Sequence, residues 1–114
     1  MTEHSNLTSE RWSRFSLTQQ ILQIGAEMHR GMSSFKPEHA ASLTASYERA
    51  LRLTDLTVQV GARDGLRREL LRWRDVVAEL CLRDQPDPAT HRLALRVLLQ
   101  LNAEAAEQIP LLGL

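Results

Sequence analysis

The chain has 114 residues, of which 43% are hydrophobic and 25% charged, and its 14 basic side chains balance 14 acidic ones. This length predicts a single domain with a core of its own, and the zero net charge argues against a dedicated binder of nucleic acid or membrane surfaces. Cys81 is the only cysteine, which excludes an intramolecular disulfide and a cysteine-based metal cluster. We expect a cytoplasmic protein, because the N-terminal residues lack a signal-peptide pattern and no apolar run approaches the roughly 20 residues of a membrane helix.

The first predicted helix runs from Ser16 to about Gly31, after a polar stretch, residues 1–15, that we expect to be an N-terminal tail. Ser16 and Gln19 have the spacing of a capping box, in which each side chain hydrogen-bonds the other residue's exposed amide. Gly25 lies inside this helix, where glycine is unfavourable, and predicts the close approach of a neighbouring helix. Apolar residues at helical spacing predict a buried face made of Leu17, Ile21, Ile24 and Met28.

Two further helices are predicted between positions 37 and 82. Pro37 suits the first turn of the second helix, where its missing N–H costs nothing, and the helical pattern continues to about Val60. Glycines at positions 61 and 65 mark the turn that follows. The third helix extends from about Leu66 to Leu82. Its apolar stripe consists of Leu66, Leu70, Trp73, Val77 and Leu80.

The fourth predicted helix begins at Asp87 and Pro88, which suit the N-cap and the first helical position, and continues to about Gln108. Residues 110–114 are expected to form a short apolar C-terminal tail. Four amphipathic segments with short links predict an all-α fold, an antiparallel up-down-up-down four-helix bundle that occupies residues 16–109. The spacing in the fourth helix predicts an inward face of Leu93, Val97, Leu101 and Ala105.

The fourth helix carries more apolar surface than a single bundle of this size covers. Apolar residues lie around much of its circumference, and the C-terminal tail continues the same character. We therefore expect a homo-oligomeric contact, or a contact with a partner protein, through this helix. The candidate surface consists of Leu95, Leu98, Leu99, Leu111 and Leu112.

Polar residues on the apolar helix faces are the most informative ones for a site. Asp55 lies on the inner flank of the second helix and Arg74 borders the core on the third, which predicts an ion pair that fixes the register of the helices. Gln20 and Glu27 lie against Ile24 in the first helix. The alternative is an active-site cluster with perturbed carboxylates, which is less well supported because no nucleophile or metal ligand joins these residues.

The sequence carries no recognisable catalytic or cofactor motif. A di-metal bundle requires Glu-x-x-His, and the residue three positions after Glu27 is Arg30. There is no His-Glu-x-x-His and no glycine-rich phosphate loop, so we expect neither a metal nor a cofactor. Cys81 and His91 are the residue types of a nucleophile and its base, but Cys81 lies between leucines in a pattern that predicts burial. We therefore expect no enzymatic activity.

Arginines cluster where the third helix begins. Contacts to a phosphate backbone would use such side chains, and the surface is therefore a candidate nucleic-acid face. It consists of Arg63, Arg67, Arg68 and Arg72. Acidic residues interleave with the arginines at Asp64, Glu69, Asp75 and Glu79. A solvated helix face with many ion pairs is therefore the favoured interpretation.

Three segments resemble a family of small bacterial and archaeal helical proteins of unknown function. The first matches a Gln-x-x-x-Ile-Gly-x-Glu-x-x-Arg pattern at Gln20, Ile24, Gly25, Glu27 and Arg30. The second matches Arg-Ala-Leu-x-Leu-x-Asp-Leu-Thr at residues 49–57, and the third is an arginine-containing pattern at residues 66–77. The resemblance covers about residues 12–82 and implies no catalytic residue. It implies a shared structural polar network of Gln20, Glu27, Arg49, Asp55 and Arg74.

Three functions are compatible with these observations. The favoured hypothesis is a non-enzymatic helical interaction or oligomerisation module, an adaptor or accessory protein, because apolar helix surface is in surplus. The second is a nucleic-acid-associated accessory protein that uses the arginine-rich face. Small helical bundles that bind nucleic acid, such as the ribosomal-RNA intervening-sequence proteins, are similar in architecture but have a basic excess that this chain lacks. The third is an enzyme built on Glu27, Asp55 and neighbouring arginines.

Overall fold

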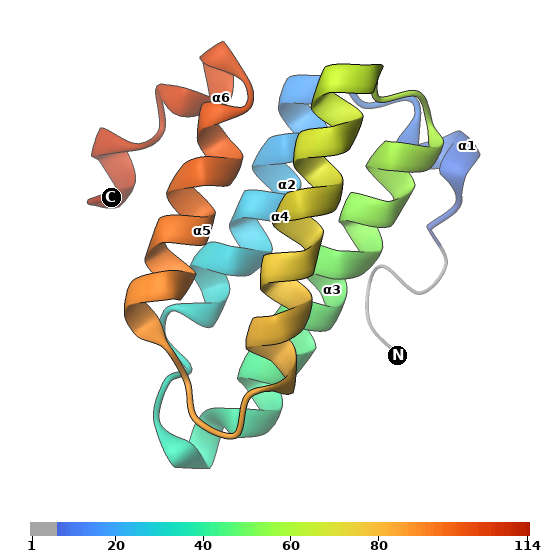
Figure 1. The fold of residues 1–114 in the computed structure, drawn as a ribbon. Coiled ribbons are helices and arrows are strands. Elements are labelled where there is room, and N and C mark those ends of the chain that lie inside the picture. The colour runs from blue at the N-terminus through green and yellow to red at the C-terminus, as the bar shows by residue number, and fades with distance from the viewer. Residues whose placement is uncertain (1–6) are drawn as a thin grey trace.

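The computed structural model describes residues 7–114, and every regular element in this range is helical (Figure 1). The prediction of an all-α fold is thereby confirmed. The long helices are α2 (Leu17–Gly31), α3 (Ala40–Gln59), α4 (Asp64–Leu82) and α5 (Pro88–Gln100). The shorter elements are α1 (Ser9–Trp12), α6 (Ala103–Ala106) and the 3-10 helices η1 (Pro37–His39) and η2 (Pro110–Leu112). No helix within residues 7–114 is both long enough and apolar enough to cross a membrane.

The long helices surround a common core. Each packs against the next along the chain, and α5 packs back against α2. Consecutive long helices run in opposite directions, as Figure 1 shows. Side chains from all of these helices form one continuous apolar cluster, to which α1 adds Trp12 and α6 adds Ala105. The short outer elements are therefore part of the same folded unit as the long helices.

Local capping signals place the start of two helices correctly. The Ser16 hydroxyl accepts a hydrogen bond from the Gln19 amide at 3.1 Å, and the Gln19 side chain accepts one from the Ser16 amide at 2.9 Å. This reciprocal pair is the predicted capping box at the start of α2. Asp87 caps α5 by accepting from the Thr90 amide at 3.1 Å, and Pro88 occupies the first helical position. Both N-terminal predictions are confirmed.

The expected N-terminal tail is wrong for residues 7–15, whereas residues 1–6 lie outside the described range. The segment forms α1, and Trp12 is fully buried against the long helices. The indole Nε1 donates to the Thr57 hydroxyl in α3 at 2.9 Å. The Gln20 amide then holds the following turn by donating to the backbone oxygens of Trp12 and Phe15 at 3.2 and 3.0 Å. Burial of the large Trp12 side chain thus packs this otherwise polar segment against the core.

The fourth predicted helix ends early and is followed by a compact turn. It stops at Gln100 rather than near Gln108, and α6 begins after Asn102. The Asn102 side chain accepts from the Ala105 amide at 2.9 Å and from the Thr18 hydroxyl at 3.1 Å, so it starts a new helix instead of continuing the old one. The predicted C-terminal tail forms η2 and folds back, with the Gly113 backbone oxygen accepting from Arg92.

The rotation of α5 about its axis differs from the prediction. Leu93 and Val97, which we expected inside, are 60% and 38% exposed. Because apolar residues surround most of α5, their spacing alone does not decide which side faces the core. The predicted oligomer surface is correspondingly wrong for three of its members, since the buried residues of α5 are His91, Ala94, Leu95, Leu98 and Leu99.

The close approach predicted at Gly25 is confirmed. A Cβ atom at this position would lie 3.3 Å from Leu99 Cδ2 and 3.6 Å from Leu95 Cδ1. The glycine therefore lets α2 and α5 pack closely at the point where the two leucines of α5 enter the core. This contact explains why Leu95 and Leu99 are inaccessible to a second molecule.

Candidate functional site

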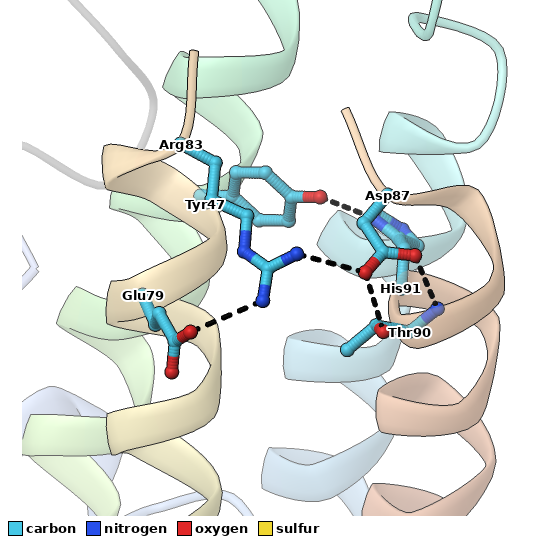
Figure 2. Close-up of polar contacts among 6 residues, drawn as sticks. All are labelled: Tyr47, Glu79, Arg83, Asp87, Thr90 and His91. Carbon is cyan, nitrogen blue, oxygen red and sulfur yellow. Dashed lines mark hydrogen bonds and ion pairs between the residues drawn. The ribbon is translucent and has the colours of Figure 1, made fainter. Parts of the chain in front are cut away.

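A buried imidazole joins three helices near the connection between α4 and α5. His91, in the first turn of α5, is fully buried. Its Nε2 lies 2.6 Å from the backbone oxygen of Met28 in α2, and its Nδ1 lies 2.6 Å from the hydroxyl of Tyr47 in α3, which points at the ring in Figure 2. Phe35 packs edge-on against the imidazole, with ring centroids 5.1 Å apart. A Cβ atom at Gly31 would lie only 3.0 Å from the imidazole Cε1 atom, so the ring fills its space completely.

The two hydrogen bonds determine which nitrogen of His91 carries the proton. A backbone carbonyl only accepts, so Nε2–H donates to Met28 and Nδ1 accepts from the Tyr47 hydroxyl. Burial lowers the pKa of His91 below its ordinary value of 6.5, although the bond to Met28 opposes this shift. Burial also raises the pKa of Tyr47 to about 12, with smaller contributions from the nearby Cys81 and Asp87. Both rings are therefore neutral near pH 7.

A polar cluster covers this pair on the side of the α4–α5 connection (Figure 2). Asp87 accepts from the Thr90 hydroxyl at 2.7 Å and from Arg83 at 2.9 Å, and Arg83 also donates to Glu79 at 3.1 Å. These bonds lower the pKa of Asp87, and the Thr90 hydroxyl makes the largest contribution. Arg83 thus connects the end of α4 to the beginning of α5.

The geometry of the imidazole site is that of a structural connection. His91 is fully buried and Tyr47 is 2% exposed, and both imidazole nitrogens already hold hydrogen-bond partners. Cys81 is partly exposed rather than buried as predicted, but burial and the charge of Glu48 raise the pKa of its thiol. A protonated thiol is a poor nucleophile. Neither His91 nor Tyr47 was expected in a site, because the residues that complete it lie 44 and 63 positions apart in sequence.

A second polar group surrounds Glu27 between α2 and α3. The carboxylate is 3% exposed and accepts from Arg49 Nε and from Arg30 Nη1, each at 2.9 Å. Arg49 is itself 19% exposed and also reaches the Ser46 hydroxyl at 3.5 Å. Glu27 and Arg49 are less exposed than the partners of the other ion pairs described in this section. A buried carboxylate requires such partners, because an unpaired charge there is costly.

The predicted ion pair between Asp55 and Arg74 is present and joins α3 to α4. Arg74 donates to the two carboxylate oxygens at 2.5 and 3.2 Å, and the pKa of the guanidinium is raised chiefly by this hydrogen bond. The side chains are 45% and 35% exposed, so the pair lies at the surface rather than sealed within the core. This partial exposure agrees with the predicted position of both residues at the border of the core.

The five residues of the predicted network occupy three separate places. Glu27 binds Arg49, Asp55 binds Arg74, and Gln20 holds the turn after α1 through backbone oxygens. The residues do share a role, since each connects two helical segments. The helical pattern identified these polar side chains and paired Asp55 with Arg74, but it did not assign Arg49 to Glu27, because that partner comes from another helix.

The candidate nucleic-acid face divides into two parts. All of its arginines are exposed, but Arg63 lines a pocket at the beginning of α4, whereas Arg72 lines a groove between α4 and α5. Arg72 also lies 3.6 Å from Glu69. Arg63 with Arg67 and Arg68 with Arg72 form two pairs at i, i+4 spacing, and these pairs lie on different sides of the helix.

A groove between α4 and α5 was not predicted, because two of its lining residues, Leu93 and Val97, were expected to face the core. It has a volume of about 200 Å³ and a largely apolar lining. Trp73 forms part of its floor, fixed by a hydrogen bond from its Nε1 to the backbone oxygen of Ala94 at 2.7 Å. We call this feature the α4–α5 groove. Its lining residues are Glu69, Arg72, Trp73, Val76, Thr90, Leu93, Ala94 and Val97.

Comparison with known proteins assigns no family to the chain: no protein-family model, no curated protein and no solved structure matches it. The resemblance to small prokaryotic helical proteins stays a prediction. Within residues 7–114, no group of three or more histidine, cysteine, aspartate or glutamate side chains is arranged to hold a metal ion.

Protonation of His91 is expected to destabilise the fold. Because its pKa is lower in the folded chain than its ordinary 6.5, the unfolded chain takes up the proton first as the pH falls. The free energy of unfolding should therefore decrease below about pH 6.5, with a slope approaching about 1.4 kcal/mol per pH unit. Denaturant titrations at a series of pH values measure this slope. His39→Gln, at an exposed histidine, should keep it and His91→Gln should reduce it; an unchanged slope in His91→Gln would refute the assignment.

The two ion pairs should differ in energetic importance. Arg49→Met leaves a buried carboxylate with one arginine fewer and is expected to lower the free energy of unfolding by about 3–5 kcal/mol. The same substitution at Arg74 should cost about 1 kcal/mol or less, because Asp55 remains hydrated. Chemical denaturation of both variants makes the comparison with an identical change of side chain. Equal costs at the two positions would contradict the difference in burial.

Proposed function

We propose that the chain is a non-enzymatic interaction module, an up-down-up-down four-helix bundle that associates with a second copy of itself through the α4–α5 groove. The observation that carries this proposal is the exposed apolar lining of the groove. Leu93 and Val97 are 60% and 38% exposed, and Val76 across the groove is 41% exposed. Apolar side chains gathered in this way in a soluble chain are typical of a protein contact.

The shape of the groove supports a helix as its occupant. Its lining residues from α4 follow the spacing i, i+3, i+4, i+7 from Glu69 to Val76. Its lining residues from α5 follow the same spacing from Thr90 to Val97. Two helical stripes side by side form the kind of surface that accepts the ridge of a third helix. Trp73 gives this surface a rigid floor, because its indole is held to the backbone of α5.

A second copy of the chain supplies a suitable ridge. Leu93 and Val97 project from α5 at the border of the groove, so a two-fold contact lets each copy insert its α5 ridge into the groove of the other. The charges near the groove are few. The only formal charges on α5 are those of Arg92 and Arg96, and the charged residues of α4 that line the groove are Glu69 and Arg72.

Other observations favour binding over catalysis. The one imidazole within a polar cluster of the described chain is fully buried and fully hydrogen-bonded, and the thiol of Cys81 is held protonated. The nucleic-acid alternative has less support, because the arginines of the candidate face lie on different sides of α4. An enzyme built on Glu27 and Asp55 lacks support as well, since the two carboxylates bind different arginines in different places.

The association can be tested at Leu93. Leu93→Glu places a charge on the exposed ridge and should convert a dimer of the chain into a monomer at micromolar concentration, as measured by light scattering after size exclusion. Leu111→Glu is the matched control, because Leu111 is 76% exposed in η2 and lies outside the groove. The control variant should remain dimeric. A monomeric parent chain, or a Leu93→Glu variant that is still dimeric, would contradict the proposal.

A further inference from the structure

A second hollow, separate from the α4–α5 groove, is lined by residues of the connection between α3 and α4 and of the turn after α1. The connection between α3 and α4 lies at the upper right of Figure 1. The volume of this hollow, about 380 Å³, falls within the range of about 300–1,000 Å³ that small-molecule sites occupy. We call it the α3–α4 pocket. It is lined by Ser13, Phe15, Leu17, Gln20, Thr57, Val60, Gly61, Ala62, Arg63 and Leu66.

The lining of the pocket includes a side chain with an unused hydrogen-bond acceptor. Gln20 is 5% exposed, and its Nε2 donates to the backbone oxygens of Trp12 and Phe15. Both partners are carbonyls, so the orientation of the amide is fixed and its Oε1 faces away from them. This oxygen accepts no hydrogen bond from the described chain, yet it is not sealed from solvent. The neighbouring Thr57 hydroxyl is already occupied by Leu53 and Trp12.

The mouth of the pocket is positive. Arg63 is exposed and lines it, and this residue is also the N-cap of α4. No side chain caps the helix there, so its first amides and the positive end of its dipole add to the charge of the guanidinium. Asp64 follows in the first turn but does not line the pocket. The site therefore offers donors at the mouth and an acceptor at Gln20.

Apolar side chains separate the two polar ends. Phe15 and Leu17 are each 37% exposed, and Val60 and Leu66 complete the wall from α3 and α4. These residues provide a surface for an apolar body between the acceptor and the arginine. A rigid flat ring with a donor at one end and an anion at the other matches this order of groups.

We propose that the α3–α4 pocket binds a small phenolic carboxylic acid. The carboxylate contacts Arg63 and the first amides of α4, the ring lies between Phe15 and Leu66, and the hydroxyl donates to Gln20 Oε1. Each group of the ligand thus meets a group of the pocket that has no other hydrogen-bond partner or that is exposed to solvent. Binding requires no change in the fold, because the lining is already in place.

The probe for this site is 4-hydroxybenzoate, titrated into the ¹⁵N-labelled chain and followed by amide chemical shifts. Saturable shifts at residues 60–66 are expected. Arg63→Glu should weaken binding by about tenfold or more, because a charge-assisted bond is replaced by repulsion. Arg68→Glu makes the same change of charge outside the pocket and should leave the affinity within about twofold of the parent. Benzoate, which lacks the hydroxyl, should bind several-fold more weakly.

A variant that fills the pocket provides an independent test. Leu66→Trp adds volume to a partly exposed wall and should abolish the shifts while the chain keeps its helical circular dichroism. Absence of shifts at residues 60–66 in the parent chain would overturn the proposal. Equal weakening by Arg63→Glu and Arg68→Glu would also overturn it, because it would indicate non-specific attraction of an anion. Equal affinity for benzoate and 4-hydroxybenzoate would exclude the assigned role of Gln20.

Discussion

The contact on which this fold depends most is the hydrogen-bonded imidazole of His91. It joins the backbone of α2, the tyrosine of α3 and the first turn of α5, which are three elements distant in sequence. A buried polar ring is tolerated only if both nitrogens are satisfied, and here each has one partner of the required type. The arrangement also fixes the rotation of α5, because a rotation that exposed His91 would break both bonds. The outward position of Leu93 follows from the inward position of this ring.

The same rotation links the core to the proposed function. With His91 inside, Leu95 and Leu99 enter the space that Gly25 leaves open, and Val97 lies on the outer side. Part of the exposed apolar surface therefore lies between α4 and α5 rather than on the buried side of α5. Trp73 connects these helices and gives the exposed groove its floor. A rigid groove lowers the cost of association, because its side chains lose little freedom on binding.

Local signals predicted this fold better than they predicted its site. The capping residues Ser16 and Asp87 act on amides three residues away, so their effect is visible in sequence. Trp12 bonds to a residue 45 positions away, and no local pattern indicated that it would be buried. The sequence of α5 also did not show which of its sides faces the core, because the inward position of His91 depends on its hydrogen bond to Tyr47 in α3. The two residues of an ion pair can be recognised from the helix faces on which they lie. How far their side chains are buried depends on the neighbouring helices.

The central claim is that His91 is a neutral, immobile connection with its proton on Nε2. Nitrogen-15 NMR of the imidazole side chain tests this directly, because the two neutral tautomers and the charged form differ in their ring-nitrogen shifts. The structure predicts a single Nε2-protonated tautomer that stays neutral as the pH is lowered through 6.5, with an Nε2 proton that exchanges slowly with solvent. An imidazole that titrates near pH 6.5, or that populates both tautomers, would show that the ring does not hold the three helices together.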